Sequence, residues 1–435
     1  MPQPAPLPSR RTSRLLQLGR LTGAVAGAVL AKGTRQLATG GWPAMRELLL
    51  TPANANRLAD RLSEMRGAAI KVGQLLSMEA GDYLPPEVTA VLARLREAAH
   101  PMPLGQVADV LGKAWGAHWE KDFERFWFTP IAAASIGQVH EALMRDGKHL
   151  AVKVQYPGVR DAIDSDLRNL ATLLRLLRLV PPELDLAALL EEARAQLHRE
   201  ADYLAEAAAI VEYSALLRDA PDFILPSVQA ELTSPEVLAM SFVPGHPVEE
   251  LADAPSETRN KVATRLLDLA LRELLQWGLV QTDAHFGNYR YDPQSERIGL
   301  LDFGATRRHG ASCMAGLRRL IRAAVHGDRA AIEDQAIELG YLRPDEAASC
   351  RDAMLDMIAT VAEPARSSKP FAFAASDLSQ RVAAQAAALR LRQRYWHLPP
   401  LDILFLHRKL AGTYLLCARL RAQAEVAALV EPYLL

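Results

Sequence analysis

The stretch from Leu279 to Thr306 constrains the fold and function of this chain more than any other. It contains two carboxylates, Asp283 and Asp302, and one amide, Asn288. An Asp292-Pro293 turn between two short β-prone runs folds the stretch back on itself. Carboxylate and amide oxygens that converge across a hairpin are hard ligands of the kind that Mg²⁺ prefers when it also binds phosphate. The stretch therefore predicts a phosphate and metal site.

The spacing of these residues matches the protein-kinase pattern. In that pattern a catalytic Asp precedes a metal-binding Asn at a fixed short interval, and a second Asp follows in an Asp-Phe-Gly motif. Asp283 and Asn288 keep the interval, and Asp302-Phe303-Gly304 supplies the second motif. The His-Arg pair that usually precedes the catalytic Asp is replaced by Gln281-Thr282. The combination favours a nucleotide site over two solvated turn carboxylates.

Length and composition indicate the broad class of protein. The chain has 435 residues, of which 50% are apolar, so it can bury a large core. Its formal net charge of -1 gives no global sign of nucleic-acid binding. Cys313, Cys350 and Cys417 are far apart and show neither metal-ligand spacing nor a disulfide framework, which indicates a reducing compartment. Abundant helix formers predict mostly helix with a minor sheet.

Residues 1–50 form a basic segment in which the first acidic residue is Glu47. Its apolar run, Leu21–Ala31, is too short to span a bilayer. We expect a transit peptide or a membrane-surface segment here, with a disordered basic tail as the alternative. No apolar run after Thr306 is long enough to span a bilayer either.

Residues 51–120 are expected to form a helical hairpin. From Asn54 to Glu79 the apolar residues recur at steps of four and three, as on one face of a packed helix. A neighbouring face carries Lys71 and Gln74 between residues suited to burial. On spacing alone, a solvated surface stays the common interpretation of such a pair. Pro85-Pro86 then opens the second helix.

A strand pattern follows. Strands are expected at 126–131 and 138–144, and an Asp146-Gly147 turn predicts a hairpin with the next strand. Lys153 lies in the middle of that strand, where a kinase has the lysine that holds nucleotide phosphates. The loop between the first two strands takes the place of a glycine-rich phosphate loop and is expected to be stiffer, because alanine lacks the freedom of glycine. It consists of Ala132, Ala133, Ala134, Ser135, Ile136 and Gly137.

Two helices are expected next, at 161–179 and 185–217. The strand lysine of such a site needs a helix carboxylate. Glu200 is our first choice for the partner of Lys153, and Glu192 is the second.

The remaining chain is divided at an expected hinge, Val243-Pro244-Gly245. Residues 121–243 are predicted to form a kinase-like N-lobe with inserted helices, and 244–435 a helical C-lobe. A helix capped by Ser256 and ending at Gly278 leads into the Asp283 stretch.

These motifs resemble those of the UbiB-type atypical kinase-like proteins, a family that supports ubiquinone (coenzyme Q) biosynthesis. The similarity runs from about Asn54 past Asp302. One departure is Ala284-His285-Phe286-Gly287-Asn288, where the family often has His-Pro-Gly-Asn. The resemblance is carried by Lys71-Val72-Gly73-Gln74, which matches the family's Lys-x-Gly-Gln signature, by Ala132–Gln138, by Val152–Val159, by Glu200-x-Asp202 with Tyr203 and Glu206, and by Leu301–Thr306.

The resemblance implies an α+β, bilobal protein-kinase-like fold, mostly helical, in which the Lys-x-Gly-Gln extension covers the active site. Together with the motifs it implies a role for each candidate residue. These are catalysis by Asp283, Lys153 and Glu200; nucleotide binding by Ala132, Ala133, Ala134, Ser135, Lys153 and Met240; regulation by Lys71, Gln74, Asp202 and Glu206; and metal binding by Asn288 and Asp302.

The implied function is that of an ATP- and Mg²⁺-dependent kinase-like ATPase supporting ubiquinone synthesis. Its expected location is peripheral, on the cytoplasmic face of the inner membrane, or the matrix side in a eukaryote. Expected partners are ATP and ADP, membrane lipids or isoprenoid quinone intermediates, and quinone-biosynthesis enzymes, without nucleic acid; a homodimer stays open. The alternatives are a small-molecule or lipid kinase and a nucleotide-binding scaffold. No Ala-Pro-Glu segment marks a docking platform for protein substrates.

Overall fold

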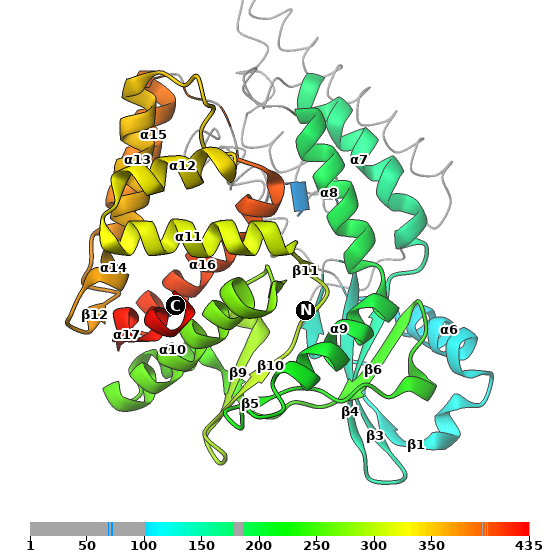
Figure 1. Cartoon of the computed structure of the whole chain (residues 1–435). Helices are drawn as coiled ribbons and strands as arrows, with labels where there is room; N and C mark the ends of the chain where they lie inside the picture. The colour runs from blue at the N-terminus through cyan, green and yellow to red at the C-terminus, as the bar shows by residue number, and fades with distance from the viewer. Residues whose placement is uncertain are drawn as a thin grey trace, which may run out of the picture. The chain divides into compact units, whose positions relative to one another are not determined.

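The computed structural model describes Ala68, Lys71, Val72 and residues 101–134, 136–176, 186–393, 395, 397 and 399–434. These residues combine helices with mostly antiparallel sheets, as the composition predicts (Figure 1). The basic segment 1–50, most of 51–120, Gln74 and Ser135 lie outside the described residues.

The chain divides into two compact units. The first takes the described residues up to Ala208 together with Ser227–Phe242, and the second takes Ala209–Pro226 together with Val243–Leu435. Residues 209–226 thus belong with the second unit, and the division into four expected segments stays a prediction. The border after Phe242 falls at the expected hinge. Gly245 there has a φ of 107°, and a Cβ would lie 2.5 Å from the carbonyl oxygen of Tyr291, so the position requires glycine.

The first unit is built on a five-stranded antiparallel sheet. The order of its main strands is β1-β3-β4-β6, and β2 pairs with β3. The Asp146-Gly147 signal is confirmed, because Gly147 takes a φ of 87° in the turn between β3 and β4. The strands are β1 Phe123–Phe126, β2 Ala132–Ala133, β3 Gly137–Met144, β4 His149–Gln155 and β6 Val237–Ser241.

One face of this sheet packs on helix α6, Leu104–Trp115, which buries Val107 and Leu111 against Val152 and Val154. The strand expected at 126–131 is wrong: β1 ends at Phe126. Its aromatic side chains pack around Trp119 instead of alternating along a longer strand.

The helices after the sheet are α7, Val159–Leu176, α8, Leu186–Glu200, and α9, Tyr203–Leu216. We expected a single helix over 185–217, and this is wrong because the helix breaks at Ala201-Asp202. The Asp202 side chain accepts a hydrogen bond from Ala205 N at 3.0 Å and so caps α9. The Ala201 carbonyl, left at the end of α8, accepts from Gln155 Nε2 at 3.0 Å.

The first long helix that lies wholly within the second unit is α10, Ser256–Leu271, which continues as a π-helical segment, η6, over Arg272–Trp277. The N-cap is Pro255, so the expected cap by the Ser256 side chain is wrong. The helical run ends as predicted at Gly278, which has a left-handed φ of 65°.

A four-stranded sheet and a two-stranded ladder follow. The sheet order is β5-β10-β9-β7, and β9 and β10 form the hairpin predicted around Asp292-Pro293. The ladder pairs β8 with β11. Their bounds are β5 Phe223–Ile224, β7 His246–Pro247, β8 Leu279–Gln281, β9 Tyr289–Asp292, β10 Arg297–Leu300 and β11 Thr306–Arg308, with the short helices η5 Val248–Asp253 and η7 Phe286–Asn288.

The rest of the unit is mainly helical, as the sequence predicts, and α11, α12, α13 and α15 form one group in Figure 1. Within the described part of the chain, no helix combines the length and apolarity of a membrane span. The elements are α11 Ala311–His326, α12 Arg329–Glu338, α13 Ala348–Val361, α14 Glu363–Arg366, β12 Phe371–Ala372, α15 Leu378–Gln393, α16 Leu401–Arg419, β13 Gln423–Ala424, α17 Val426–Val430 and η8 Glu431–Tyr433.

Candidate nucleotide and metal site

The catalytic loop follows β8 directly and returns to the sheet through η7 and β9. The Asn288 side-chain amide donates from Nδ2 to the carbonyl oxygen of Asp283 at 2.8 Å. Asn288 N also donates to the carbonyl of His285 at 2.9 Å. The structure therefore brings Asp283 and Asn288 together, and the Nδ2 bond leaves the Asn288 side-chain oxygen available as an acceptor, as the predicted metal ligand requires.

Asp302 follows β10 on the same hairpin. Leu301 N donates to the carbonyl of Asn288 at 3.1 Å, which joins the two ends of the candidate site. An oxygen of the Asp302 carboxylate accepts from Gly304 N at 2.9 Å. Phe303 is buried and packs edge-on against Tyr213, with ring centroids 5.0 Å apart. The Asp-Phe-Gly segment is thus anchored by its Phe and its own backbone.

Arg408 of α16 contacts the Asp283 carboxylate, with the two side chains 14% and 28% exposed. Our sequence reasoning did not identify Arg408. It lies 125 positions from Asp283, so no local signal could have found it. The guanidinium fixes the direction of the carboxylate that is predicted to orient the nucleophile.

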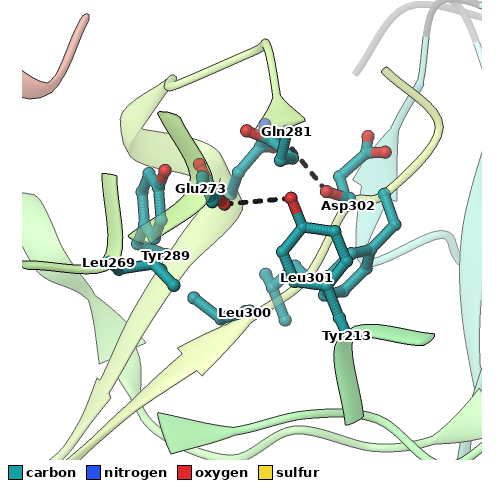
Figure 2. Close-up of a pocket in the computed structure, with 10 residues that line it drawn as sticks. Tyr213, Leu269, Glu273, Gln281, Tyr289, Leu300, Leu301 and Asp302 are labelled. Carbon is teal, nitrogen blue, oxygen red and sulfur yellow. Dashed lines mark hydrogen bonds between the residues drawn. The ribbon is translucent and has the colours of Figure 1, made fainter. Parts of the chain in front are cut away.

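A small pocket lies beside Asn288 and Asp302, and polar side chains converge on it (Figure 2). It has room for no more than about one water molecule, far less than a nucleotide-sized ligand needs. We interpret it as part of the support under the loops. Tyr213, Leu269, Glu273, Gln281, Asn288, Tyr289, Leu300, Leu301, Asp302 and Phe303 line it.

Buried charges stabilise this support. Lys409 Nζ lies 2.5 Å from a Glu273 oxygen, and Tyr213 donates to the other Glu273 oxygen at 3.0 Å. Burial raises the pKa of Glu273, while Lys409 and Tyr213 act against that rise. Burial by itself lowers the pKa of Lys409, but Glu273 and Tyr289 outweigh it, so Lys409 stays a cation. Burial also raises the pKa of Tyr213 well above its ordinary value.

The phosphate-binding lysine expected in the first unit has a carboxylate partner. Lys153, in the middle of β4, donates to the two Glu206 oxygens at 2.9 and 2.8 Å. Both side chains are buried, and the ammonium also lies over the Tyr203 ring, 5.4 Å from its centroid. The expected Lys153–Glu200 pair is wrong, because the first turn of α9, rather than the end of α8, presents the partner.

Glu200 instead pairs with Lys71, whose side chain is only 3% exposed. The interpretation of Lys71 as a solvated surface residue is therefore wrong. Asp202, the other acid of the Glu200-x-Asp202 motif, caps α9. Glu192, our second choice for Lys153, contacts Arg199 at 3.1 Å.

The alanine-rich loop is shorter than expected. Ala132 and Ala133 form the exposed strand β2 and pair with Val139 and Gln138. Ala134 N donates to the carbonyl of Gly137 at 2.9 Å. Met240, the other expected nucleotide contact, is buried in β6. Nucleotide binding by these residues stays a prediction.

The metal residues do not form a closed cluster. In the described ranges, no group of three or more His, Cys, Asp or Glu side chains converges as in an all-protein metal site. Asn288 and Asp302 instead supply an amide and a carboxylate. Such a partial set suits Mg²⁺, which keeps waters and phosphate oxygens in its shell.

These features define a protein-kinase-like class. The first unit has a strand lysine bound to a helix glutamate. The second has Asn288 and Asp302 next to the two ends of one hairpin, with the Asp283 carbonyl bonded to Asn288.

Comparison with known proteins gives the family. The ABC1 atypical kinase-like domain matches residues 94–336. The mitochondrial atypical kinase COQ8 of Saccharomyces cerevisiae is 37% identical over 427 residues, which cover 98% of this chain and 85% of that protein. The mitochondrial atypical kinase COQ8B of Rattus norvegicus is 36% identical, with 96% of this chain and 79% of that protein covered. The chain belongs to the UbiB-type (ABC1) family of atypical kinase-like proteins.

A solved structure agrees with this assignment. The Rv3197–erythromycin complex from Mycobacterium tuberculosis has a TM-score of 0.61 and 28% identity, with 87% of this chain and 94% of that chain covered. The predicted family, kinase-like fold and enzyme class are thus confirmed, and ATP use follows from the class. The roles of the individual site residues stay predictions.

Proposed function

We propose that this chain is a Mg²⁺-dependent atypical kinase or ATPase that supports ubiquinone biosynthesis at a membrane surface. The observation that carries the proposal is the connected set of hydrogen bonds among Asp283, Asn288 and Leu301-Asp302 in the second unit. A protein that only binds partners as a scaffold has no need of this set. The names of the COQ8 relatives support the choice of an atypical kinase.

The residues fit a magnesium ion chemically. Asn288 donates from its NH₂ group to the carbonyl of Asp283, so the Asn288 side-chain oxygen would be the ligand. Asp302 would supply a carboxylate. When bound, the cation would neutralise charge on the phosphates. Lys153, held by Glu206, would bind phosphate oxygens. Asp283, held by Arg408, would orient the attacking hydroxyl or water.

The same proposal includes a peripheral location on the inner membrane, with lipids or isoprenoid quinone intermediates and quinone-biosynthesis enzymes as partners. The basic character of residues 1–50 supports membrane attachment. Several relatives are named as mitochondrial proteins, which supports a mitochondrial location in a eukaryote, and the matrix side is part of the proposal.

Purified full-length protein tests the proposal through phosphate release from ATP. The assay compares Mg²⁺ with EDTA, with and without anionic vesicles and a polyprenylated phenol, and mass spectrometry searches for phosphorylated products. Asp302→Asn is the test variant, and Asp292→Asn, an exposed turn carboxylate on the same hairpin, is its matched control. Magnesium-dependent phosphate release that only Asp302→Asn abolishes supports an ATPase. A phosphorylated phenol or lipid favours the kinase alternative, and the lack of magnesium-dependent nucleotide binding refutes both.

A further inference from the structure

Gln281 occupies the junction of the two loops that carry the candidate site. It is the last residue of β8 and pairs with Thr306, the first residue of β11. Strand β8 leads into Asp283, and β11 follows Asp302. Main-chain pairing therefore fixes where both loops meet the ladder, but it does not fix the distance between Asp283 and Asp302 beyond it.

The Gln281 side chain bridges this gap. Its Nε2 donates to the carbonyl oxygen of Asp283 at 3.0 Å. It also donates to the carbonyl oxygen of Asp302 at 3.2 Å, a bond that Figure 2 shows. The amide has two hydrogens, so each carbonyl receives one. Asn288 donates to the same Asp283 carbonyl. One side chain thus connects the predicted nucleophile-orienting residue with the two predicted metal ligands.

A role in packing alone does not explain this side chain. Gln281 is 6% exposed, and its Oε1 has no hydrogen-bond partner among the described residues. A buried acceptor without a partner is destabilising, and an apolar side chain of similar volume would avoid that loss. The feature that glutamine supplies and an apolar residue lacks is the double donor to Asp283 and Asp302.

We propose that Gln281 is a positioning residue that sets the spacing of Asp283 and Asp302 and so the metal geometry of the site. The inference rests on the proposed function, because this spacing matters only where Asn288 and Asp302 bind a metal. Residues that orient metal ligands through hydrogen bonds commonly change metal affinity or activity when they are replaced.

The test measures ADP affinity by calorimetry in Mg²⁺ and in EDTA for the full-length parent and three variants. Gln281→Met keeps the length of the side chain and removes both donors. Gln281→Asn keeps the amide but is one methylene too short to reach both carbonyls. It replaces Gln281→Met as the test variant if the Met variant does not fold. Thr282→Val is the matched control, because Thr282 is the buried residue directly after β8 and donates to the Ala305 carbonyl at 2.8 Å, rather than to either site carbonyl.

For both Gln281 variants, we expect the magnesium-dependent gain in ADP affinity to fall roughly 10- to 100-fold, with affinity in EDTA unchanged. The control should keep the gain of the parent, even if its melting temperature falls. If folded Gln281→Met or Gln281→Asn keeps a magnesium-dependent gain in ADP affinity as large as that of the parent, the assignment is overturned. An equal loss in Thr282→Val also overturns it, since the effect would then come from loosening of the ladder. A parent without any magnesium-dependent gain refutes the proposed function and this role with it.

Discussion

Replacement of Lys409 by Met should destabilise the second unit strongly. Lys409 and Glu273 are 2% and 1% exposed and lie 2.5 Å apart, so the substitution leaves a carboxylate buried without its cation. Breaking such a buried pair costs about 3–5 kcal/mol of unfolding free energy. The double variant Lys409→Met with Glu273→Gln should recover most of the loss. It removes the unpaired charge, and the glutamine oxygen can still accept the hydrogen bond from Tyr213.

The loss in Lys409→Met should depend on pH in a defined direction. Burial raises the pKa of Glu273, and Lys409 opposes the rise. Without Lys409 the pKa rises further, so the folded state binds a proton that the unfolded state releases above the ordinary glutamate pKa. Because the folded state then binds more protons, the stability of the variant falls as pH increases through that window. The destabilisation should therefore be smaller at about pH 5 than at about pH 8.

Urea denaturation followed by circular dichroism at several pH values measures both effects. The matched control is Lys261→Met, which breaks an exposed contact with Glu296, where the side chains are 45% and 59% exposed. Its cost should not exceed about 1 kcal/mol. A Lys409→Met loss as small as that of the control, or one that grows toward acid pH, would refute the buried-charge reasoning.

Three further outcomes test the site and the membrane assignment. Glu206→Gln should weaken ATP binding measured by calorimetry, because it removes the Glu206 charge beside Lys153; an unchanged dissociation constant contradicts a role of this pair in ATP binding. Lys71→Ala should alter the ATPase rate or allow autophosphorylation, because it removes the buried Lys71–Glu200 ion pair; parental values of both, in a folded protein, leave Lys71 with a structural role only. Removal of the residues before Asn54 should weaken co-sedimentation with anionic vesicles at low salt, since each arginine near such a surface adds about 1 kcal/mol; undiminished binding places attachment elsewhere.

The part of the site encoded by local spacing was predictable from the sequence. Asn288 and Asp302 flank one hairpin whose turn residues are explicit, and Asp283 lies five positions before Asn288, so their proximity follows from short-range rules. Arg408 and Lys409 are different. They come from a helix more than a hundred positions along the chain, and their neighbours in sequence show an ordinary amphipathic pattern. Only the packing of α16 reveals that one cation contacts the catalytic loop and the other a buried glutamate.

The break between α8 and α9 shows how a local signal can be outweighed. Residues 185–217 are rich in helix formers, and their composition favours one continuous helix. Asp202 can also cap a new helix, and the Ala201 carbonyl gains the Gln155 side chain as its donor. Both ends of the break are therefore satisfied by hydrogen bonds, so the interruption carries little cost.

That break also decides which carboxylate belongs to which lysine. On one continuous helix, Glu200 and Glu206 would keep a fixed angular offset, and the choice of Glu200 as the partner of Lys153 assumed such a helix. The break removes this constraint and lets Glu200, at the end of α8, contact Lys71 while Glu206, in the first turn of α9, contacts Lys153. Each lysine is buried, and a buried cation without a carboxylate is costly. The two acids are therefore not interchangeable, and the loss of either leaves its own lysine without that charge.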